Sequence, residues 1–125
     1  ISGYAHGASL GIQFAGGEIP VICLTGDESF LSYPQALWTA GHYGLNTKFI
    51  IAKTQGINSL KIMPSAPTKK TLRWQYSSPR IDIKELSEAF GVPAQAVRTF
   101  SQLEPSILRL FEANGPRLLE VDVNC

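Results

Sequence analysis

Stretches with helical spacing alternate with short apolar runs along this chain. From Ser2 to Ala15 the sequence has helical character, and small residues recur at every fourth position, namely Gly3, Gly7, Gly11 and Ala15. On a helix they form one row along one face, so we expect another part of the molecule to approach that row closely. Two interpretations are open: tight packing of the helix against a sheet, or a helix N-terminus near Gly3 and Tyr4 that faces an anion.

Two apolar runs predict neighbouring strands in the first half of the chain. Pro20–Thr25 is largely apolar, which is typical of a strand buried on both faces at the centre of a parallel sheet. Lys48–Ala52 is rich in the β-branched and aromatic residues that strands favour. With a helix between them, the two strands form a right-handed crossover and run parallel.

The intervening helix is predicted to begin near Tyr33. Ser32 and Gln35 have the spacing of a capping box, and Pro34 is tolerated in a first turn, where its missing N–H costs nothing. The helix would end at Gly44. It would direct four side chains toward the core, namely Ala36, Leu37, Ala40 and Tyr43.

The segment from Lys53 to Arg80 has no regular pattern and contains one Gly, four Ser and three Pro residues among scattered Lys and Arg. We expect a long loop there, with a short helix around Ile57–Ile62. A loop of this length in a compact domain usually serves as a lid, a binding loop or an interface segment.

Regular elements return after this segment. Asp82 and Glu85 form a second capping box, and the helix that follows them is predicted to end at Gly91. The stretch Ala94–Thr99 is predicted to form a strand.

The last helix and the last strand complete the pattern. Ser101 and Glu104 form a third capping box, and the helix they open would stop at Asn114–Pro116. Arg117–Val123 supplies the last strand. This alternation predicts one α/β domain over residues 1–125, a three-layer fold in which helices cover both faces of a parallel sheet. Ligands of such sheets bind at the carboxyl ends of the strands.

The composition limits the classes of function. A length of 125 residues with 44% hydrophobic and 17% charged residues is typical of one globular domain. The net charge of +1 is too small for the positive field that attracts nucleic acid, so we expect no nucleic-acid partner.

The cysteines and the ends of the sequence indicate the setting. Two cysteines show neither metal spacing nor a disulfide framework, and no secretory or membrane-spanning run is visible, so we expect a cytoplasmic protein without a membrane association. The first residue is Ile1 and not Met, which suggests a processed or trimmed chain or a piece of a longer protein.

Polar side chains follow both predicted strands of the first half. One strand leads into Gly26-Asp27-Glu28-Ser29 and the other into Lys53-Thr54-Gln55-Gly56. We expect both tetrapeptides at the same edge of the sheet, with Asp27 close to Thr54. A bound diphosphate needs N–H donors, glycine for close approach and a divalent cation that is itself held by a carboxylate. Asp27 can supply the carboxylate, Gly26 the close approach, and Ser29 a hydroxyl and an N–H. A Gly-Asp pair also occurs in ordinary turns, so alone it is not specific.

The order of motifs resembles a known family. Gly26-Asp27-x-Ser29 is followed by a helix reading Ala36–Ala40, by Tyr43-Gly44-Leu45 and by an apolar strand. This order resembles the thiamine-diphosphate-binding domain of benzoylformate decarboxylase and its relatives, whose motif is Gly-Asp-Gly, a helix and strand, and Asn-Asn. The 27 positions from Asp27 to Thr54 are similar to the family spacing. The likeness continues through Leu86–Val92 and Gly115–Val121 and covers nearly the whole chain.

The resemblance implies a site for thiamine diphosphate and Mg²⁺. Asp27 would be a magnesium ligand, Thr54 would stand where the family has a ligand asparagine, and Gly56 would offer its carbonyl oxygen. The residues expected beside the cofactor are Ser2, Gly3, Tyr4, Gly26, Asp27, Glu28, Ser29, Thr54 and Gly56. Catalytic residues are not predicted.

The sequence departs from the family motif at this site. Glu28 replaces the second glycine, and Lys53-Thr54 replaces the asparagine pair. A glutamate beside the diphosphate adds like charge, which at about 4 Å costs roughly 1 to 4 kcal/mol. A threonine hydroxyl is a poorer ligand than a carboxamide, and Lys53 would be repelled by Mg²⁺. Two compensations are open: Glu28 becomes a metal ligand, or Lys53 pairs with Asp27 or Glu28 or contacts a phosphate.

Three other side chains have less specific expectations. His6 and His42 are expected in surface or packing roles, although His6 lies one turn from the expected cofactor. Trp38 is expected in the core.

Three hypotheses of function follow. In the resembled family a separate domain, usually from another subunit, supplies the aminopyrimidine site, so we expect a pyrimidine-binding partner and a homo- or hetero-oligomer. The first hypothesis is the diphosphate- and magnesium-binding domain of a lyase that decarboxylates a 2-oxo acid. The second is a degenerate non-catalytic homologue that serves as a structural or regulatory partner. The third is a sequence altered by design or drift from an active parent.

Overall fold

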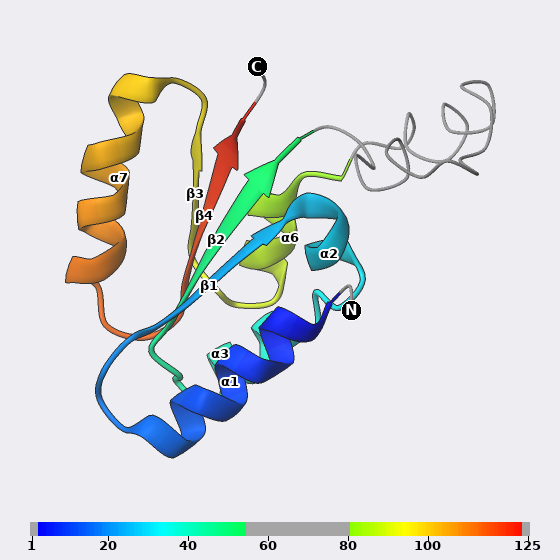
Figure 1. Cartoon of the computed structure of the whole chain (residues 1–125), viewed down its shortest axis with the longest axis vertical. Coiled ribbons are helices and arrows are strands. Elements are labelled where there is room, and N and C mark those ends of the chain that lie inside the picture. The colour runs from blue at the N-terminus through cyan, green and yellow to red at the C-terminus, as the bar shows by residue number, and fades with distance from the viewer. Residues whose placement is uncertain (1–2, 55–80, 124–125) are drawn as a thin grey trace, which may run out of the picture.

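The described residues form a parallel sheet between two layers of helices. The computed structural model describes residues 3–54 and 81–123 (Figure 1). All strand pairs are parallel, and the strand order is β1-β2-β4-β3. The strands are β1 (Val21–Gly26), β2 (Thr47–Lys53), β3 (Ala94–Val97) and β4 (Arg117–Asp122). The predicted α/β fold, with a parallel sheet and helices on both faces, is therefore confirmed.

The helices divide unequally between the two faces of the sheet. One face packs against α1 (Tyr4–Gly16), α2 (Asp27–Leu31), α3 (Ala36–His42) and α6 (Ile83–Ala89). The other packs against α7 (Phe100–Glu112), which stands by itself on the left of Figure 1. Within the described ranges, no helix is long and apolar enough to span a membrane.

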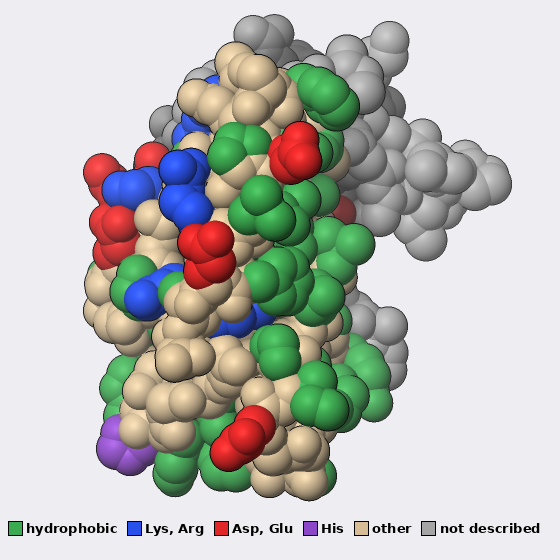
Figure 2. Space-filling model, turned by 90° about the vertical axis from the view of Figure 1, so that its left-hand side faces the viewer, with side chains coloured by type: hydrophobic (Ala, Val, Ile, Leu, Met, Phe, Trp, Pro, Cys, Tyr) green, Lys and Arg blue, Asp and Glu red, His purple; other side chains and the backbone are tan. Residues whose placement is uncertain are grey.

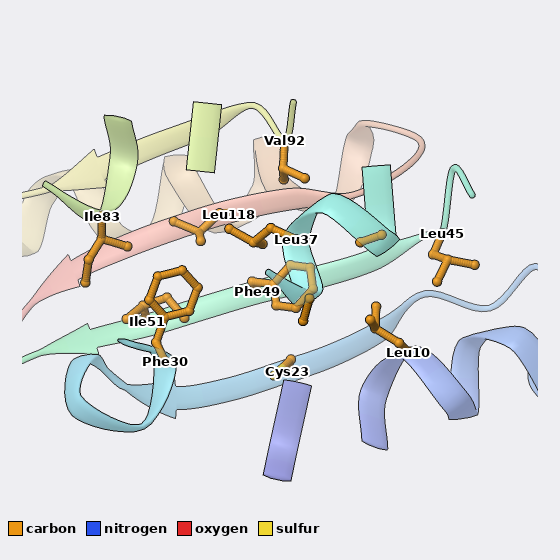
Figure 3. Packing of buried hydrophobic residues seen from close by; sticks show 12 residues of the cluster. Leu10, Cys23, Phe30, Leu37, Leu45, Phe49, Ile51, Ile83, Val92 and Leu118 are labelled. Atoms are coloured by element: carbon orange, nitrogen blue, oxygen red, sulfur yellow. The ribbon is translucent and has the colours of Figure 1, made fainter. Parts of the chain in front are cut away.

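The larger hydrophobic core lies on the side of the four helices. Phe49 and Ile51 point from β2 toward Leu37 and Phe30, and all four side chains are fully buried (Figure 3). Burying a large apolar side chain contributes roughly 1.5–3 kcal/mol. This packing holds β1 and β2 in a fixed register, in which Gly26 pairs with Ala52. Both strands therefore end at the same level, as a site shared between their carboxyl ends requires.

β1 is an edge strand of the described sheet, and the prediction that it lies at the centre was wrong. Ile22 is 52% exposed and Leu24 is 67% exposed. The reason is that α7 packs over β3 and β4 and leaves β1 uncovered on this face. Figure 2 shows the resulting band of hydrophobic side chains along the right-hand side, while most charged side chains lie in the upper part. A run of apolar residues indicates that both faces of a strand are suited to burial. Among the described residues, helices cover only one face of β1.

The helix predicted to begin near Tyr33 begins at Ala36. Ser32 instead follows α2, and its hydroxyl donates to the Glu28 carbonyl oxygen (3.2 Å). The capping-box spacing was misleading, because Ser32 ends one short helix before the next begins. Tyr43 and Trp38, both expected in the core, are exposed, and the Trp38 ring stacks on His42 with centroids 4.7 Å apart.

The two helices of the second half differ in how well their caps were predicted. Asp82 caps α6 as predicted, because its carboxylate accepts from the Glu85 N–H (2.9 Å). The cap of α7 is Thr99, with a capping box to Gln102, and not Ser101. Thr99 and Gln102 have the same spacing two residues earlier, so the pattern alone did not distinguish the two frames.

The row of small residues on α1 does not pack against the sheet. Gly7 and Gly11 are exposed, and a Cβ added at either would meet no described atom within 4 Å. The helix packs through its other face, which carries His6, Ser9, Leu10 and Gln13. Only Gly3 is close to a neighbour: an added Cβ would lie 3.4 Å from the Ser32 and Tyr33 side chains.

Candidate functional site

Asp27 and Thr54 meet where β1 and β2 end, as the sequence predicted. The Thr54 hydroxyl donates to Asp27 Oδ1 (3.1 Å), and the Thr54 N–H donates to Asp27 Oδ2 (3.1 Å). The Glu28 N–H donates to Asp27 Oδ1 (3.0 Å). Gly26 ends β1 in an extended conformation, and the chain then turns directly into α2. The Asp27 carboxylate is therefore fixed by three donors at the carboxyl edge of the sheet.

The residue before α1 contacts α2, the helix that Asp27 opens. The Gly3 N–H donates to Ser29 Oγ (2.9 Å), across 26 positions of the sequence. Gly3 has φ of +80°, a left-handed conformation that favours glycine. Tyr4 follows with an exposed side chain. The predicted neighbourhood of Gly3 and Ser29 is thus present, whereas Ser2 and Gly56 lie outside the described residues.

The geometry of Asp27 and Thr54 fits a magnesium ion in part. Mg²⁺ binds six oxygens octahedrally at 2.0–2.1 Å, which places adjacent ligands about 2.9 Å apart. The 3.1 Å between Asp27 Oδ1 and Thr54 Oγ1 is close to that separation once the hydroxyl proton turns away. Among the described residues, no group of three or more His, Cys, Asp or Glu side chains could hold a metal. A cation here would therefore need further oxygens, such as those of a diphosphate.

Glu28 occupies the first turn of α2 next to Asp27. Both acidic side chains lie in this turn, where the partial positive charge of a helix N-terminus stabilises carboxylates. This provides a structural reason for Glu28. It also adds a second negative charge within one residue of the predicted metal ligand.

Lys53 is engaged on the other side of β2, away from Asp27. Its ammonium lies 2.9 Å from Glu120 Oε1, which forms an ion pair between the end of β2 and β4. Glu120 also accepts hydrogen bonds from Arg98 and from the Lys84 N–H (3.2 Å). Of the compensations left open by the sequence, the pairing of Lys53 with Asp27 or Glu28 is not the one formed, because Lys53 pairs with Glu120. Successive residues of a strand point to opposite faces, so Thr54 and Lys53 have different neighbours.

Glu120 is a buried charge that sequence reasoning missed. Burial alone would raise the pKa of this carboxyl, but the hydrogen bonds from Lys53 and Arg98 hold its pKa below the ordinary value. The same contact raises the pKa of the Arg98 guanidinium. A signal was present in the sequence, since Glu120 stands among the apolar residues of the last strand. Charged residues are rarely fully buried unless they are paired.

His6 lies in the first turn of α1 and has a packing role, as expected. Its ring is fully buried, 5.4 Å from the Phe30 ring and 6.4 Å from the Phe49 ring by centroids. Its Nδ1 lies 3.3 Å from the Gly3 carbonyl oxygen, and its Nε2 has no partner among the described residues. Burial lowers the pKa of His6, and the Gly3 hydrogen bond offsets this only partly.

Comparison with known proteins agrees with this arrangement. The model of the family "Thiamine pyrophosphate enzyme, C-terminal TPP binding domain" matches residues 1–121. An acetolactate synthase large subunit of Porphyra purpurea is 30% identical over 126 residues, which cover 97% of this chain and 21% of that protein. The isozyme 2 large subunit of acetolactate synthase from Escherichia coli K12 is 25% identical over 98% of this chain and 22% of its own length.

A solved structure extends the likeness to three dimensions. The thiamine diphosphate-dependent 4-hydroxybenzoylformate decarboxylase of Rhodococcus jostii RHA1 superposes with a TM-score of 0.83 at 30% identity. The match covers 98% of this chain and 23% of that chain. The present chain thus spans a quarter or less of the proteins it resembles. Acetolactate synthases and the decarboxylase match at similar identity, so identity alone does not separate these two branches.

The family assignment follows from two agreeing observations. The family model spans almost the entire chain, and the parallel sheet superposes on a thiamine diphosphate-dependent enzyme. The chain therefore belongs to the family of C-terminal TPP-binding domains of thiamine pyrophosphate enzymes.

Proposed function

We propose that this chain is the diphosphate- and Mg²⁺-binding domain of a thiamine diphosphate-dependent enzyme that cleaves a carbon–carbon bond of a 2-oxo acid. Thiamine diphosphate would supply the carbanion chemistry when bound. Asp27 and Thr54 would hold the cation, and the backbone at Gly3 and the Ser29 hydroxyl would lie along the diphosphate. A separate pyrimidine-binding domain, in the same protein or in another subunit, would complete the cofactor site.

One observation carries the proposal. The carboxylate of Asp27 and the hydroxyl of Thr54 are 3.1 Å apart at the ends of two adjacent parallel strands. The Gly3–Ser29 contact adds a glycine backbone with left-handed φ at the same edge. A carboxylate, a second oxygen and a close glycine backbone are what a diphosphate with its divalent cation needs.

The second candidate is a non-catalytic relative that keeps the fold without the cofactor. It is favoured by the donors that already surround Asp27: three hydrogen bonds from Thr54 and Glu28 satisfy its oxygens without a cation. A bound cation would have to replace at least the hydroxyl proton of Thr54. The two candidates therefore differ in one measurable quantity, the affinity for Mg²⁺ and thiamine diphosphate.

Calorimetric titration of the chain with thiamine diphosphate and Mg²⁺ tests the proposal. We expect heat of binding from the chain as it stands and its loss in Asp27→Asn. Asp82→Asn is the matched control, because it makes the same substitution at a helix cap, where asparagine caps as well as aspartate.

Restoring the family motif separates the candidates further. Glu28→Gly together with Lys53→Asn and Thr54→Asn should strengthen binding tenfold or more, which corresponds to about 1.4 kcal/mol. If the unchanged chain gives no heat and the restored variant binds, the non-catalytic candidate is correct. If neither binds while both remain folded by circular dichroism, this chain by itself does not form the cofactor site, and the proposal then requires binding once the pyrimidine-binding domain is added.

A further inference from the structure

We propose that Glu120 is a positioning residue of the candidate metal site, and that it acts by holding the Lys53 ammonium away from Asp27. The idea rests on the proposed function, since it concerns the cation that Asp27 and Thr54 would share. It explains how a lysine can stand where the family motif has asparagine without placing its charge at the cation. Glu120 itself would touch neither the cation nor the diphosphate.

Lys53 lies within reach of Asp27 along the edge of the sheet. Gly26 pairs with Ala52 in the register of β1 and β2, so Asp27 and Lys53 are the next residues on adjacent chains. Neighbouring strands lie about 4.8 Å apart. The four-carbon stem of a lysine is flexible and spans that separation. A released Lys53 ammonium would therefore have two carboxylates within reach at this edge, Asp27 on the side of β1 and Asp122, the register partner of Lys53, on β4.

The contacts of Glu120 keep the ammonium beside β4, which lies on the opposite side of β2 from β1. Glu120 is fully buried, and its carboxylate accepts from three donors, Lys53, Arg98 and the backbone N–H of Lys84. The Lys53 side chain is 21% exposed where it meets Glu120. Separating such a pair would leave a buried carboxylate short of a partner, which is strongly unfavourable. The Lys53–Glu120 pair is therefore a firm tether, and it holds the positive charge beside β4 and not beside β1.

Loss of the tether would set two cations in competition for one carboxylate. An ammonium paired with Asp27 must be displaced before a divalent cation binds there, and its charge repels the cation at short distance. We therefore expect Glu120→Gln to weaken divalent-cation binding about tenfold. The substitution keeps the shape of the side chain. The Lys53 and Arg98 side chains are 21% and 45% exposed, so each retains access to water.

The test counts Mn²⁺ bound to the full chain at saturating thiamine diphosphate, with free Mn²⁺ measured by electron paramagnetic resonance. Mn²⁺ serves as the probe because it prefers the same oxygen ligands as Mg²⁺. Four proteins are compared: the unchanged chain, Glu120→Gln, Glu120→Gln with Lys53→Asn, and Arg98→Gln. The last is the matched control, since it removes another partner of Glu120 and leaves the Lys53–Glu120 pair intact. Circular dichroism and thermal unfolding establish that each variant is folded.

The expected pattern is specific to repulsion by Lys53. Glu120→Gln should bind about tenfold more weakly, the double variant should return to within twofold of the unchanged chain, and Arg98→Gln should match it. Unaltered affinity in Glu120→Gln overturns the inference. Equal weakness of the single and double variants also overturns it, because distortion of the strand ends would then be the cause.

A crystal structure of Glu120→Gln tests the position of the Lys53 ammonium independently of metal binding. The Lys53 Nζ should lie within about 4 Å of an Asp27 oxygen, the limit for an ion pair. An ammonium that stays beside β4 refutes the role assigned to Glu120. If the unchanged chain fails to bind Mn²⁺ while this movement occurs, the proposed function fails and the tether stands.

Discussion

Lowering the pH should destabilise this chain through one buried histidine. His6 is enclosed between Phe30 and Phe49, and burial lowers its pKa. In the unfolded chain the imidazole binds a proton near its ordinary pKa of about 6.5. The folded chain resists protonation until a lower pH is reached. Between these two pKa values the unfolded state holds more protons, so the free energy of unfolding falls as the pH falls.

The slope has an upper limit that follows from linkage. One group protonated in the unfolded state alone changes the free energy of unfolding by about 1.4 kcal/mol for each pH unit. Between pH 6.5 and 5.5 the loss therefore approaches 1.4 kcal/mol at most. Above pH 7 both states are neutral at His6, and its contribution no longer changes. The contribution of neutral His6 to the free energy of unfolding is thus fully present above the pKa of His6 in the unfolded chain. It is lost as the pH falls toward the lower pKa of His6 in the folded chain.

Urea unfolding at pH 7.0, 6.5, 6.0 and 5.5 measures this slope. The comparison is with His6→Leu, which keeps an apolar side chain between the two rings and has no imidazole to titrate. The difference between the two curves isolates His6, because the other titrating groups are common to both proteins. His42→Leu is the control: His42 is exposed and stacks on Trp38, and this variant should retain the slope of the unchanged chain. The reasoning is refuted if His6→Leu loses stability with falling pH as steeply as the unchanged chain.

Three further substitutions test the packing described above by denaturant unfolding. Lys48→Met should lower the free energy of unfolding by roughly 2–4 kcal/mol, because the buried ammonium donates to two carbonyl oxygens just beyond α7 (2.5 and 2.7 Å). Lys84→Met, at a half-exposed position whose ammonium pairs with the exposed Glu88, should change it by less than about 0.5 kcal/mol. Asp82→Ala should cost about 1 kcal/mol through loss of the α6 cap, and Asp82→Asn should cost little. Gly11→Ala should raise the free energy of unfolding by roughly 0.5–1 kcal/mol, because its Cβ meets open space on a helix; a fall would mean that some group packs against this face.

The sequence by itself determined the alternation of elements and the meeting of two loops. Apolar runs and helix caps predicted a parallel sheet, and the carboxyl ends of parallel strands share one edge whatever the order of the other strands. For that reason the contact between Asp27 and Thr54, across 27 positions, is predictable from the sequence alone. Asp82 was predicted as a cap because its partner, the Glu85 N–H, lies three residues away. Interactions that depend on neighbours in sequence, or on the direction of strands, could therefore be predicted from the sequence.

Only the tertiary structure decided which face and which partner each side chain has. β1 lies at the edge because the strand order is β1-β2-β4-β3, and one of its faces is uncovered because α7 packs over β3 and β4. No local pattern states which strands will be neighbours or which of them a helix will cover. Lys53 pairs with Glu120, which is 67 positions away, because the strand order places β4 next to β2. Spacing along the chain fixes the directions of side chains relative to their own strand or helix. The identity of the neighbour opposite them depends on the packing of the whole sheet, where hydrophobic burial and paired charges are satisfied together.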